Sequence, residues 1–214
     1  MAIIAPTILT DNTELYKKLV ESYASFAQRI QIDFMDGEFA PDKSVGIDDL
    51  WWPDGLMVDM HMMVARPREY IEKLIALRPR LVIFHAEVEG ELNSEFLALK
   101  NAGIKTGVAL LKGTFPGSKK ELIERVDHVL LFSGNLGEYG GEADLLQLSK
   151  VGVIRDIKSG LEIGWDGGAN ESNVGEMARA GVNVINVGSA IAKAENPKEA
   201  YEKLMAEANK GGEV

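Results

Sequence analysis

Short apolar runs alternate with helix-like patterns along the whole chain. Eight runs have the length and composition of buried strands, and they cover residues 3–5, 29–33, 56–61, 81–85, 105–110, 128–132, 161–165 and 182–187. Between them, apolar side chains recur at the three- and four-residue spacing of helices that bury one face. Because parallel strands need a crossover connection, this alternation predicts a parallel sheet with helices packed against it.

Eight strand-helix units in 214 residues favour a closed α/β barrel, the (β/α)8 TIM barrel, whose smallest examples have about 200 residues. An open, doubly wound sheet is the alternative, and its dinucleotide-binding form carries Gly-x-Gly-x-x-Gly after the first strand. Here Pro6, Thr7, Ile8 and Leu9 follow the first run instead. Because no linker or change in composition divides the sequence, we expect a single barrel domain over residues 1–214.

The composition argues against several classes of function. The chain has 33 acidic and 23 basic residues, and this formal charge of −10 argues against a nucleic-acid partner. No cysteine is present, which excludes disulfides and thiolate metal sites and is typical of a reducing compartment. No apolar stretch approaches the roughly 20 residues of a membrane span, and the N-terminus lacks a signal-peptide pattern. We therefore expect a cytoplasmic protein without a membrane partner.

Two aspartates give the strongest indication of chemistry. Asp33 ends the second run and Asp166 directly follows the seventh, each just before turn residues that include glycine. The carboxyl ends of barrel strands form the mouth where barrel enzymes place their active sites. Two carboxylates across such a mouth can remove a proton from a carbon next to a carbonyl group and return one to its other face. The alternative is that each aspartate only caps a turn.

His61 ends the third run in the same way and is a candidate metal ligand. Together with Asp33 and Asp166 it would offer an imidazole and two carboxylates, which zinc, iron, manganese or cobalt accept. Three protein ligands with open positions are typical of a catalytic metal. A histidine at a strand end can also be held by hydrogen bonds alone, and we expect that structural role for His85. His128 begins a strand at the opposite end, and we assign it no function.

Glycine-bearing turns follow the sixth, seventh and eighth runs. They contain the pairs Gly140-Gly141, Gly167-Gly168 and Gly188-Ser189. Backbone N–H groups in such loops bind phosphate without a basic side chain, which would reconcile an acidic chain with an anionic substrate. Each pair taken alone is also ordinary turn chemistry at the start of a helix.

Six segments carry a family resemblance that extends over residues 4–191. They are Ile4-Ala5-Pro6-Thr7-Ile8-Leu9, Asp33-Phe34-Met35-Asp36-Gly37, Asp59-Met60-His61-Met62-Met63, Gly107-Val108-Ala109-Leu110, Asp166-Gly167-Gly168 and Gly188-Ser189-Ala190-Ile191. Each segment is short, but their order and spacing together are specific. In these segments the chain resembles the ribulose-phosphate 3-epimerases, a family of ribulose-phosphate-binding barrels.

The resemblance implies an isomerase of the pentose phosphate pathway that acts on a sugar phosphate. Such an enzyme interconverts D-ribulose 5-phosphate and D-xylulose 5-phosphate, or a close ketose phosphate, by moving the proton on C3. The resemblance also implies that Asp33 and Asp166 are the acid and base, that they hold a divalent cation with His61, and that Thr7 lies near the substrate. The phosphate would be bound by Gly140, Gly141, Gly168, Gly188 and Ser189. A homo-oligomer is implied as well.

Three departures from the family pattern leave other functions open. Gln31 stands where the family has its first metal-binding histidine, and an amide oxygen is a poorer ligand for such ions. Leu111 and Lys112 replace an Asn-Pro pair, and the loop after the sixth run has gained a residue and an acid, Glu138. The alternatives are a lyase, isomerase or decarboxylase of the same barrel group that uses Lys112, or a barrel that binds a phosphate ligand without turning it over.

Overall fold

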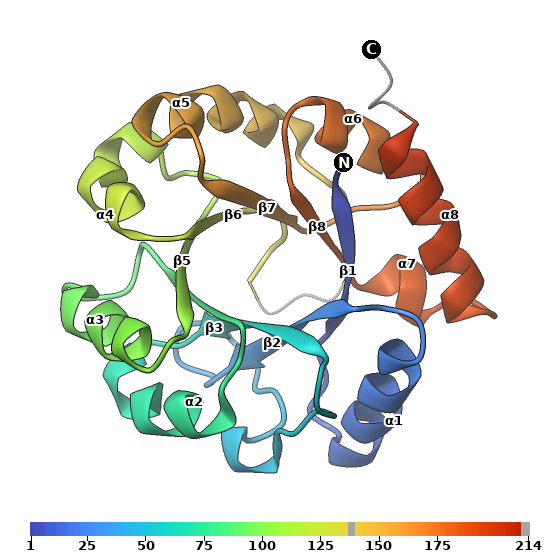
Figure 1. Cartoon of the computed structure of the whole chain (residues 1–214), viewed down its shortest axis with the longest axis horizontal. Helices are drawn as coiled ribbons and strands as arrows, with labels where there is room; N and C mark the ends of the chain where they lie inside the picture. The colour runs from blue at the N-terminus through green and yellow to red at the C-terminus, as the bar shows by residue number, and fades with distance from the viewer. Residues whose placement is uncertain (137–139, 211–214) are drawn as a thin grey trace.

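The computed structural model of the chain describes residues 1–136 and 140–210, and its strands form a closed barrel (Figure 1). Parallel strands follow one another around the barrel in chain order, and β8 pairs with β1 to close it. They are β1 (Ile3–Ile8), β2 (Arg29–Met35), β3 (Met57–Met63), β4 (Leu81–His85), β5 (Lys105–Leu110), β6 (His128–Phe132), β7 (Glu162–Asp166) and β8 (Val184–Val187). The predicted TIM barrel is confirmed, and β1 is longer than predicted because it continues through Pro6 and Thr7.

Helices connect the strands and form a ring outside the barrel (Figure 1). The α-helices are α1 (Thr13–Ala24), α2 (Ile71–Leu77), α3 (Asn93–Asn101), α4 (Lys120–Arg125), α5 (Lys150–Ile157), α6 (Val174–Arg179), α7 (Ser189–Ala192) and α8 (Pro197–Asn209). Short 3-10 helices are η1 (Ile47–Asp49), η2 (Pro67–Tyr70), η3 (Pro116–Lys119) and η4 (Leu145–Ser149). The side chains of Asn12 and Asn196 accept a backbone hydrogen bond at the start of α1 and α8. Within residues 1–136 and 140–210, no helix has both the length and the apolar character needed to cross a membrane.

Alternation along the strands sorts side chains between two environments, because successive residues point to opposite faces of a sheet. On β2, Ile30 and Ile32 belong to the main core between the strands and the helices. Gln31 and Asp33 point into the barrel, where they contact Asp166 or His61 from other strands. A small apolar cluster inside the barrel consists of Leu81, Ile83, Ala109 and Leu130. Polar side chains therefore collect at the two ends of the interior.

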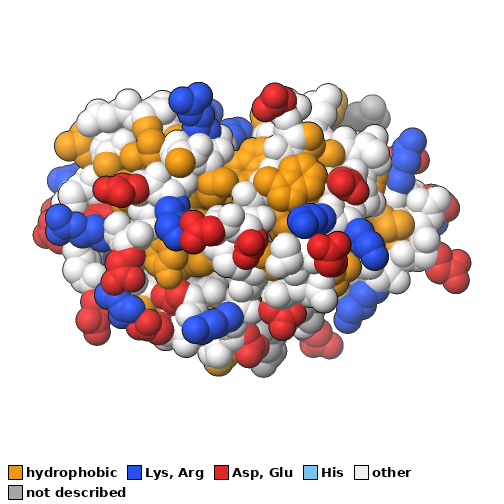
Figure 2. All heavy atoms as spheres, turned by 90° about the horizontal axis from the view of Figure 1, so that it is seen from below, with side chains coloured by type: hydrophobic (Ala, Val, Ile, Leu, Met, Phe, Trp, Pro, Cys, Tyr) orange, Lys and Arg blue, Asp and Glu red, His pale blue; other side chains and the backbone are white. Residues whose placement is uncertain are grey.

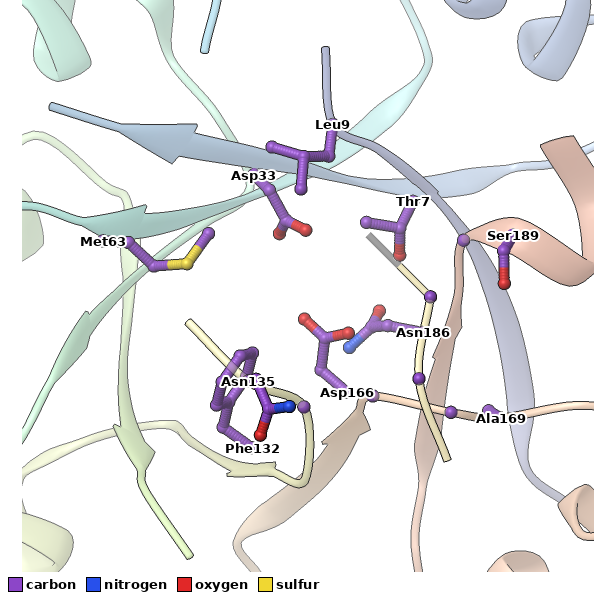
Figure 3. A pocket seen from close by; sticks show the side chains of 16 residues that line it. Thr7, Leu9, Asp33, Met63, Phe132, Asn135, Asp166, Ala169, Asn186 and Ser189 are labelled. Carbon is purple, nitrogen blue, oxygen red and sulfur yellow. The ribbon is translucent and has the colours of Figure 1, made fainter. Parts of the chain in front are cut away.

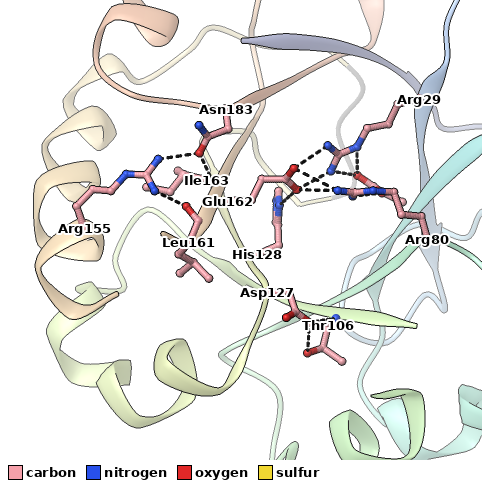
Figure 4. Close-up of polar contacts among 11 residues, drawn as sticks. Arg29, Arg80, Thr106, Asp127, His128, Arg155, Leu161, Glu162, Ile163 and Asn183 are labelled. Atoms are coloured by element: carbon pink, nitrogen blue, oxygen red, sulfur yellow. Dashed lines mark hydrogen bonds and ion pairs between the residues drawn. The ribbon is translucent and has the colours of Figure 1, made fainter. Parts of the chain in front are cut away.

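The N-terminal end of the interior holds a network of charged side chains (Figure 4). Arg29 donates to Asp59 at 2.7 Å and, with both terminal nitrogens, to Glu162 at 3.0 and 2.8 Å. Arg80 donates to the same two carboxylates at 3.1 and 3.2 Å. His128 Nδ1 contacts Glu162 at 2.9 Å. Two arginines thus face two acids, and the network ties together β2, β3, β6 and β7.

Charged side chains of both signs cover the face that Figure 2 shows, around exposed apolar ones. Lysine and arginine are interleaved with aspartate and glutamate on that face and form no continuous basic patch. The chain as a whole is acidic, with a formal charge of −10. A face of this kind lacks the clustered positive charge that nucleic-acid binding requires.

Candidate active site

The carboxyl ends of the strands surround one pocket, which Figure 3 shows from close by. Every residue predicted to act as acid, base or substrate contact lines it. These residues are Thr7, Asp33, Gly140, Gly141, Asp166, Gly168, Gly188 and Ser189. Gln31 and His61 are fully buried in the barrel interior and contact both aspartates. The structure therefore brings the predicted residues together at a single place.

Asp33 at the end of β2 and Asp166 at the end of β7 both point into the pocket (Figure 3). The amide nitrogen of Gln31 donates to Asp33 Oδ1 at 2.9 Å and to Asp166 Oδ2 at 2.6 Å. His61 Nδ1 lies 3.1 Å from the same Asp33 oxygen and 3.3 Å from the same Asp166 oxygen. Because one oxygen of each carboxylate is anchored in this way, the second oxygen of each is available to a reactant in the pocket.

Burial and mutual contact shift the ionisation of this cluster. Burial and the charge of Asp166 raise the pKa of Asp33 to about 6. Burial opposes the charged form of His61, but hydrogen bonds to Asp166 and Asp33 outweigh it and raise the pKa of His61 to about 9. In the cation-free site the imidazole of His61 is therefore protonated at neutral pH, and a bound cation would replace this proton. Asp33 changes its protonation close to neutral pH, where a general acid or base is most effective.

Three side chains of the cluster fit a divalent cation. Asp33, His61 and Asp166 each offer one ligand atom, and these atoms all lie within 4.8 Å of one another. One imidazole nitrogen and two carboxylate oxygens suit divalent ions of the first transition series. Gln31 turns its amide nitrogen toward the carboxylates, while its oxygen Oε1 is buried and has no hydrogen-bond partner in the described structure. The atom that Gln31 presents to the carboxylates is therefore a hydrogen-bond donor and not a ligand oxygen.

A second histidine lies behind His61 and fixes its ring. His61 Nε2 lies 2.9 Å from His85 Nε2, so one ring donates a hydrogen bond to the other. Burial lowers the pKa of His85 to about 4, which makes neutral His85 the acceptor and protonated His61 the donor. On its other side, His85 Nδ1 lies 3.4 Å from Glu87 Oε2. His85 does not line the pocket, which agrees with the structural role expected for it.

Glycines allow the loops after β6, β7 and β8 to meet around the pocket. Gly167 and Gly168 have φ angles of 113° and 71°, which side chains with a Cβ atom rarely adopt. A Cβ atom on Gly168 would lie 2.1 Å from the backbone nitrogen of Ala143, and one on Gly140 would lie 3.2 Å from Ser189 Oγ. The described residues that line the pocket include no lysine or arginine. Backbone N–H groups and neutral side chains are therefore the donors that it offers to an anion.

Two of the departures from the family pattern lie in the loops that follow β5 and β6. Lys112 does not line the pocket, and its Nζ donates to Asn135 Oδ1 at 2.8 Å. Glu138, the acid gained in the loop after β6, lies outside the described residues. The third departure, Gln31, stands at the centre of the site as a donor to both aspartates.

Sequence reasoning did not identify Asn186 as a site residue. It lies on β8, in register with Asp166 on β7, and lines the same pocket. The signal was a polar residue in the apolar run 182–187, because a parallel strand that is buried on both faces is normally apolar throughout. Leu9 and Phe132 were also missed as lining residues, and together with Met63 they make part of the pocket apolar.

Comparisons with known proteins agree with this geometry. The sequence model of the ribulose-phosphate 3-epimerase family matches residues 3–192. The ribulose-phosphate 3-epimerase of Helicobacter pylori is 32% identical in an alignment 212 residues long that covers 94% of this chain and 96% of that protein. The ribulose-phosphate 3-epimerase of Aquifex aeolicus is 28% identical, covering 95% of this chain and 96% of that protein. The crystal structure of 3-hexulose-6-phosphate synthase from Salmonella typhimurium has a TM-score of 0.76 at 14% identity, over 98% of this chain and 99% of that one, and shows the shared fold alone. By the extent of the family match, this chain belongs to the ribulose-phosphate 3-epimerase family.

Proposed function

We propose that this protein is a sugar-phosphate epimerase that interconverts D-ribulose 5-phosphate and D-xylulose 5-phosphate by proton transfer at C3. The observation that carries the proposal is the pair Asp33 and Asp166. The two carboxylates come from strands on different sides of the barrel, share contacts with one amide and one imidazole, and line one pocket. Family membership supports the same reaction.

Inversion at C3 needs one group that removes a proton and another that supplies one from the opposite side. One aspartate, ionised, takes the C3 proton, and the other, protonated, gives a proton to the other face of the same carbon. The reverse reaction exchanges the two roles. The raised pKa of Asp33, about 6, supports this assignment because a carboxyl group that titrates near neutral pH can serve in either form.

Negative charge develops on the substrate oxygens when C3 loses its proton, and the site must stabilise it. A divalent cation held by Asp33, His61 and Asp166, with zinc, iron, manganese or cobalt as the candidates, would supply positive charge there. His61 would bind the cation as a neutral imidazole through Nδ1, and His85 holds the ring in place through its Nε2 contact of 2.9 Å. The Gln31 amide keeps the two carboxylates in a fixed orientation.

The phosphate of the substrate would lie against the glycine-rich loops after β6, β7 and β8. These loops contribute Gly140, Gly141, Gly168, Gly188 and Ser189. Their donors carry no formal charge, so backbone N–H groups hold the anion, as in other barrels that bind phosphate after their last two strands. Thr7 supports binding from β1, because its buried Oγ1 has no hydrogen-bond partner in the described structure and faces the same pocket.

An enzyme of the same barrel group with a lysine electrophile is less well supported. Such a reaction would need a cation among the residues that line the pocket, and the described lining has none. Lys112 was the candidate, but its amino group is bound to Asn135 and it lies outside the lining. Replacing Lys112 with methionine is therefore expected to leave most of the turnover intact.

Hydrogen exchange at C3 tests the proposed reaction directly. The protein is incubated with D-ribulose 5-phosphate in heavy water, with zinc, iron, manganese or cobalt added in turn, and C3 is followed by NMR. We expect deuterium at C3 and the appearance of D-xylulose 5-phosphate. No deuterium uptake with any of these metals would rule out this substrate. Homo-oligomerisation and a cytoplasmic location stay predictions.

A further inference from the structure

Asn186 is a buried polar residue whose position in the fold has no structural explanation. It lies on β8 among the apolar residues Val184, Ile185 and Val187, and the residue is 2% exposed. Its oxygen Oδ1 has no hydrogen-bond partner among the residues that the structure describes. A buried polar atom without a partner destabilises the fold, and a valine at this place would not carry that cost. A ligand that supplies the missing hydrogen bond would explain the asparagine.

The position of Asn186 specifies which part of a ligand it can reach. It is in register with Asp166 on β7 and with Ala5 on β1, and it lines the pocket. Figure 3 shows its side chain beside that of Asp166, on the side of the pocket where Ser189 lies. Along the chain, it precedes the loop residues Gly188 and Ser189 by a single intervening residue. Asn186 therefore stands between the acid/base pair and the loops that would hold the phosphate.

The inference rests on the proposed function and specifies how the substrate is recognised. In a pentulose 5-phosphate that reacts at C3, only C4 and its hydroxyl lie between the reacting carbon and the carbon that carries the phosphate. A hydroxyl can donate to an amide oxygen and accept from an amide nitrogen, so an asparagine matches it fully. We propose that Asn186 binds the C4 hydroxyl of the substrate and makes the enzyme select for it.

Thr7 also has an unpartnered buried hydroxyl, but its neighbours are different. Thr7 is in register with Gln31 on β2. Strand β2 pairs with one edge of β1, and β8 pairs with the other edge. The partner of Thr7 in the sheet is thus Gln31, whereas Asn186 is in register with the catalytic Asp166 and comes two residues before Gly188 in the loop after β8. The C4 hydroxyl is therefore assigned to Asn186.

The test compares two substrates in two proteins. Values of kcat/KM are measured for D-ribulose 5-phosphate and for its 4-deoxy analogue, with the wild type and with Asn186→Val. We expect Asn186→Val to lower kcat/KM for ribulose 5-phosphate by about 10- to 100-fold, as the loss of a hydrogen bond to a buried group does. The wild type should lose a similar factor on the 4-deoxy analogue. The substitution should then cost little or nothing on that analogue, because the hydroxyl is already missing.

Equal losses on both substrates would assign Asn186 a purely structural role and overturn the inference, and so would unchanged kinetics with ribulose 5-phosphate. Asn186→Ala repeats the comparison if the valine variant does not fold. The matched control is Asn209→Leu, which removes an amide with an unpartnered oxygen from α8, outside the pocket, and should change neither rate. A wild type that does not turn over ribulose 5-phosphate contradicts the proposed function itself, which separates that failure from a failure of the inference.

Discussion

The two ends of the barrel interior are both polar, but they are built differently. At the N-terminal end, Arg29 and Arg80 face Asp59 and Glu162, so formal charges cancel and nearly every polar group has a partner. At the C-terminal end, the one cationic partner of Asp33 and Asp166 among the described residues is His61. The N-terminal end therefore has the properties of a structural ion-pair network. The C-terminal end has those of a ligand-binding site, in which a bound ligand would supply the missing charge and hydrogen bonds.

The unpartnered atoms show the same difference. At the C-terminal end, Gln31 Oε1, Thr7 Oγ1 and Asn186 Oδ1 are buried without a hydrogen bond within residues 1–136 and 140–210. Among the groups of the charged network at the N-terminal end, only His128 Nε2 is in that state, again within the described ranges. Buried polar atoms without partners lower stability, so their concentration at one end indicates where the fold accepts that cost for function.

Replacing an acid at the C-terminal end should have the largest effect of all. In Asp33→Asn or Asp166→Asn the side chain keeps its shape but can no longer exchange a proton, so kcat for ribulose 5-phosphate should fall by about 100- to 10,000-fold. The melting temperature should stay equal or rise, because repulsion between two buried carboxylates is relieved. Steady-state kinetics and calorimetry on the same samples measure both quantities. Loss of activity only in step with loss of folded protein would contradict the catalytic assignment.

Breaking the N-terminal network should affect stability and not chemistry. Arg29→Met removes the arginine that contacts both acids, and leaving buried charges uncompensated should cost about 3 kcal/mol of unfolding free energy. Urea denaturation measures this loss, while kcat of the folded protein should be nearly unchanged. The control is Arg66→Met at the exposed Arg66–Glu38 pair, whose side chains are 54% and 51% exposed, where no measurable change is expected. Equal losses in both variants would remove the contrast between buried and exposed pairs.

A histidine at position 31 should add a fourth ligand to the three that the site offers. Gln31→His adds an imidazole beside Asp33, His61 and Asp166, and because a direct ligand should contribute at least as much as the roughly tenfold of a residue that only supports one, the affinity for zinc should rise by at least about tenfold. Calorimetric titration of chelator-treated protein measures it. Gln147→His, in η4 and away from the pocket, is the matched control and should leave the affinity unchanged. An unchanged affinity in Gln31→His would show that position 31 does not contact the cation.

The smallest effect concerns the pH dependence of stability in metal-free protein. Asp33 has a folded pKa of about 6, above its ordinary value of 3.8, so the folded state takes up this proton first as pH falls. Stability should therefore rise by about 1 kcal/mol between pH 7 and pH 5 relative to Asp33→Asn. Burial opposes ionisation of Glu162, but hydrogen bonds from His128 and Arg29 outweigh it and hold its pKa far below the usual range. The contribution of Glu162 to the free energy of unfolding is fully present above the pKa that this group has in the unfolded chain. It is lost only in more acidic solution. A flat difference between the wild type and Asp33→Asn over this window would contradict the assignment.

The C-terminal end could be largely predicted from sequence, for a physical reason. Asp33 and Asp166 stand where apolar runs give way to turns, and in a parallel barrel all such places meet at one mouth. Local pattern alone therefore predicted their meeting, and the glycine turns after β6, β7 and β8 followed from the same rule. The same rule made His61 a candidate metal ligand, and the family resemblance then assigned a role to Thr7.

The N-terminal network and Asn186 could not be predicted in this way. Arg29 and Glu162 are 133 positions apart in sequence, and their contact depends on the register of strands that pair only when the barrel closes. A charged residue inside an apolar run shows that something must compensate it, but not which partner does. For Asn186, a polar residue in a buried strand was the signal, and its position beside Asp166 emerged only from the pairing of β7 with β8.

The central claim is that Asp33 and Asp166 act on opposite faces of the same carbon, and isotope exchange with single variants tests it most directly. Asp33→Asn and Asp166→Asn are each incubated in heavy water with D-ribulose 5-phosphate and, separately, with D-xylulose 5-phosphate. The two-sided arrangement predicts that each variant exchanges the C3 hydrogen of only one epimer, that the epimer differs between the variants, and that neither inverts C3 at an appreciable rate. Exchange of the same epimer by both variants, or inversion at the wild-type rate by either, would contradict the account.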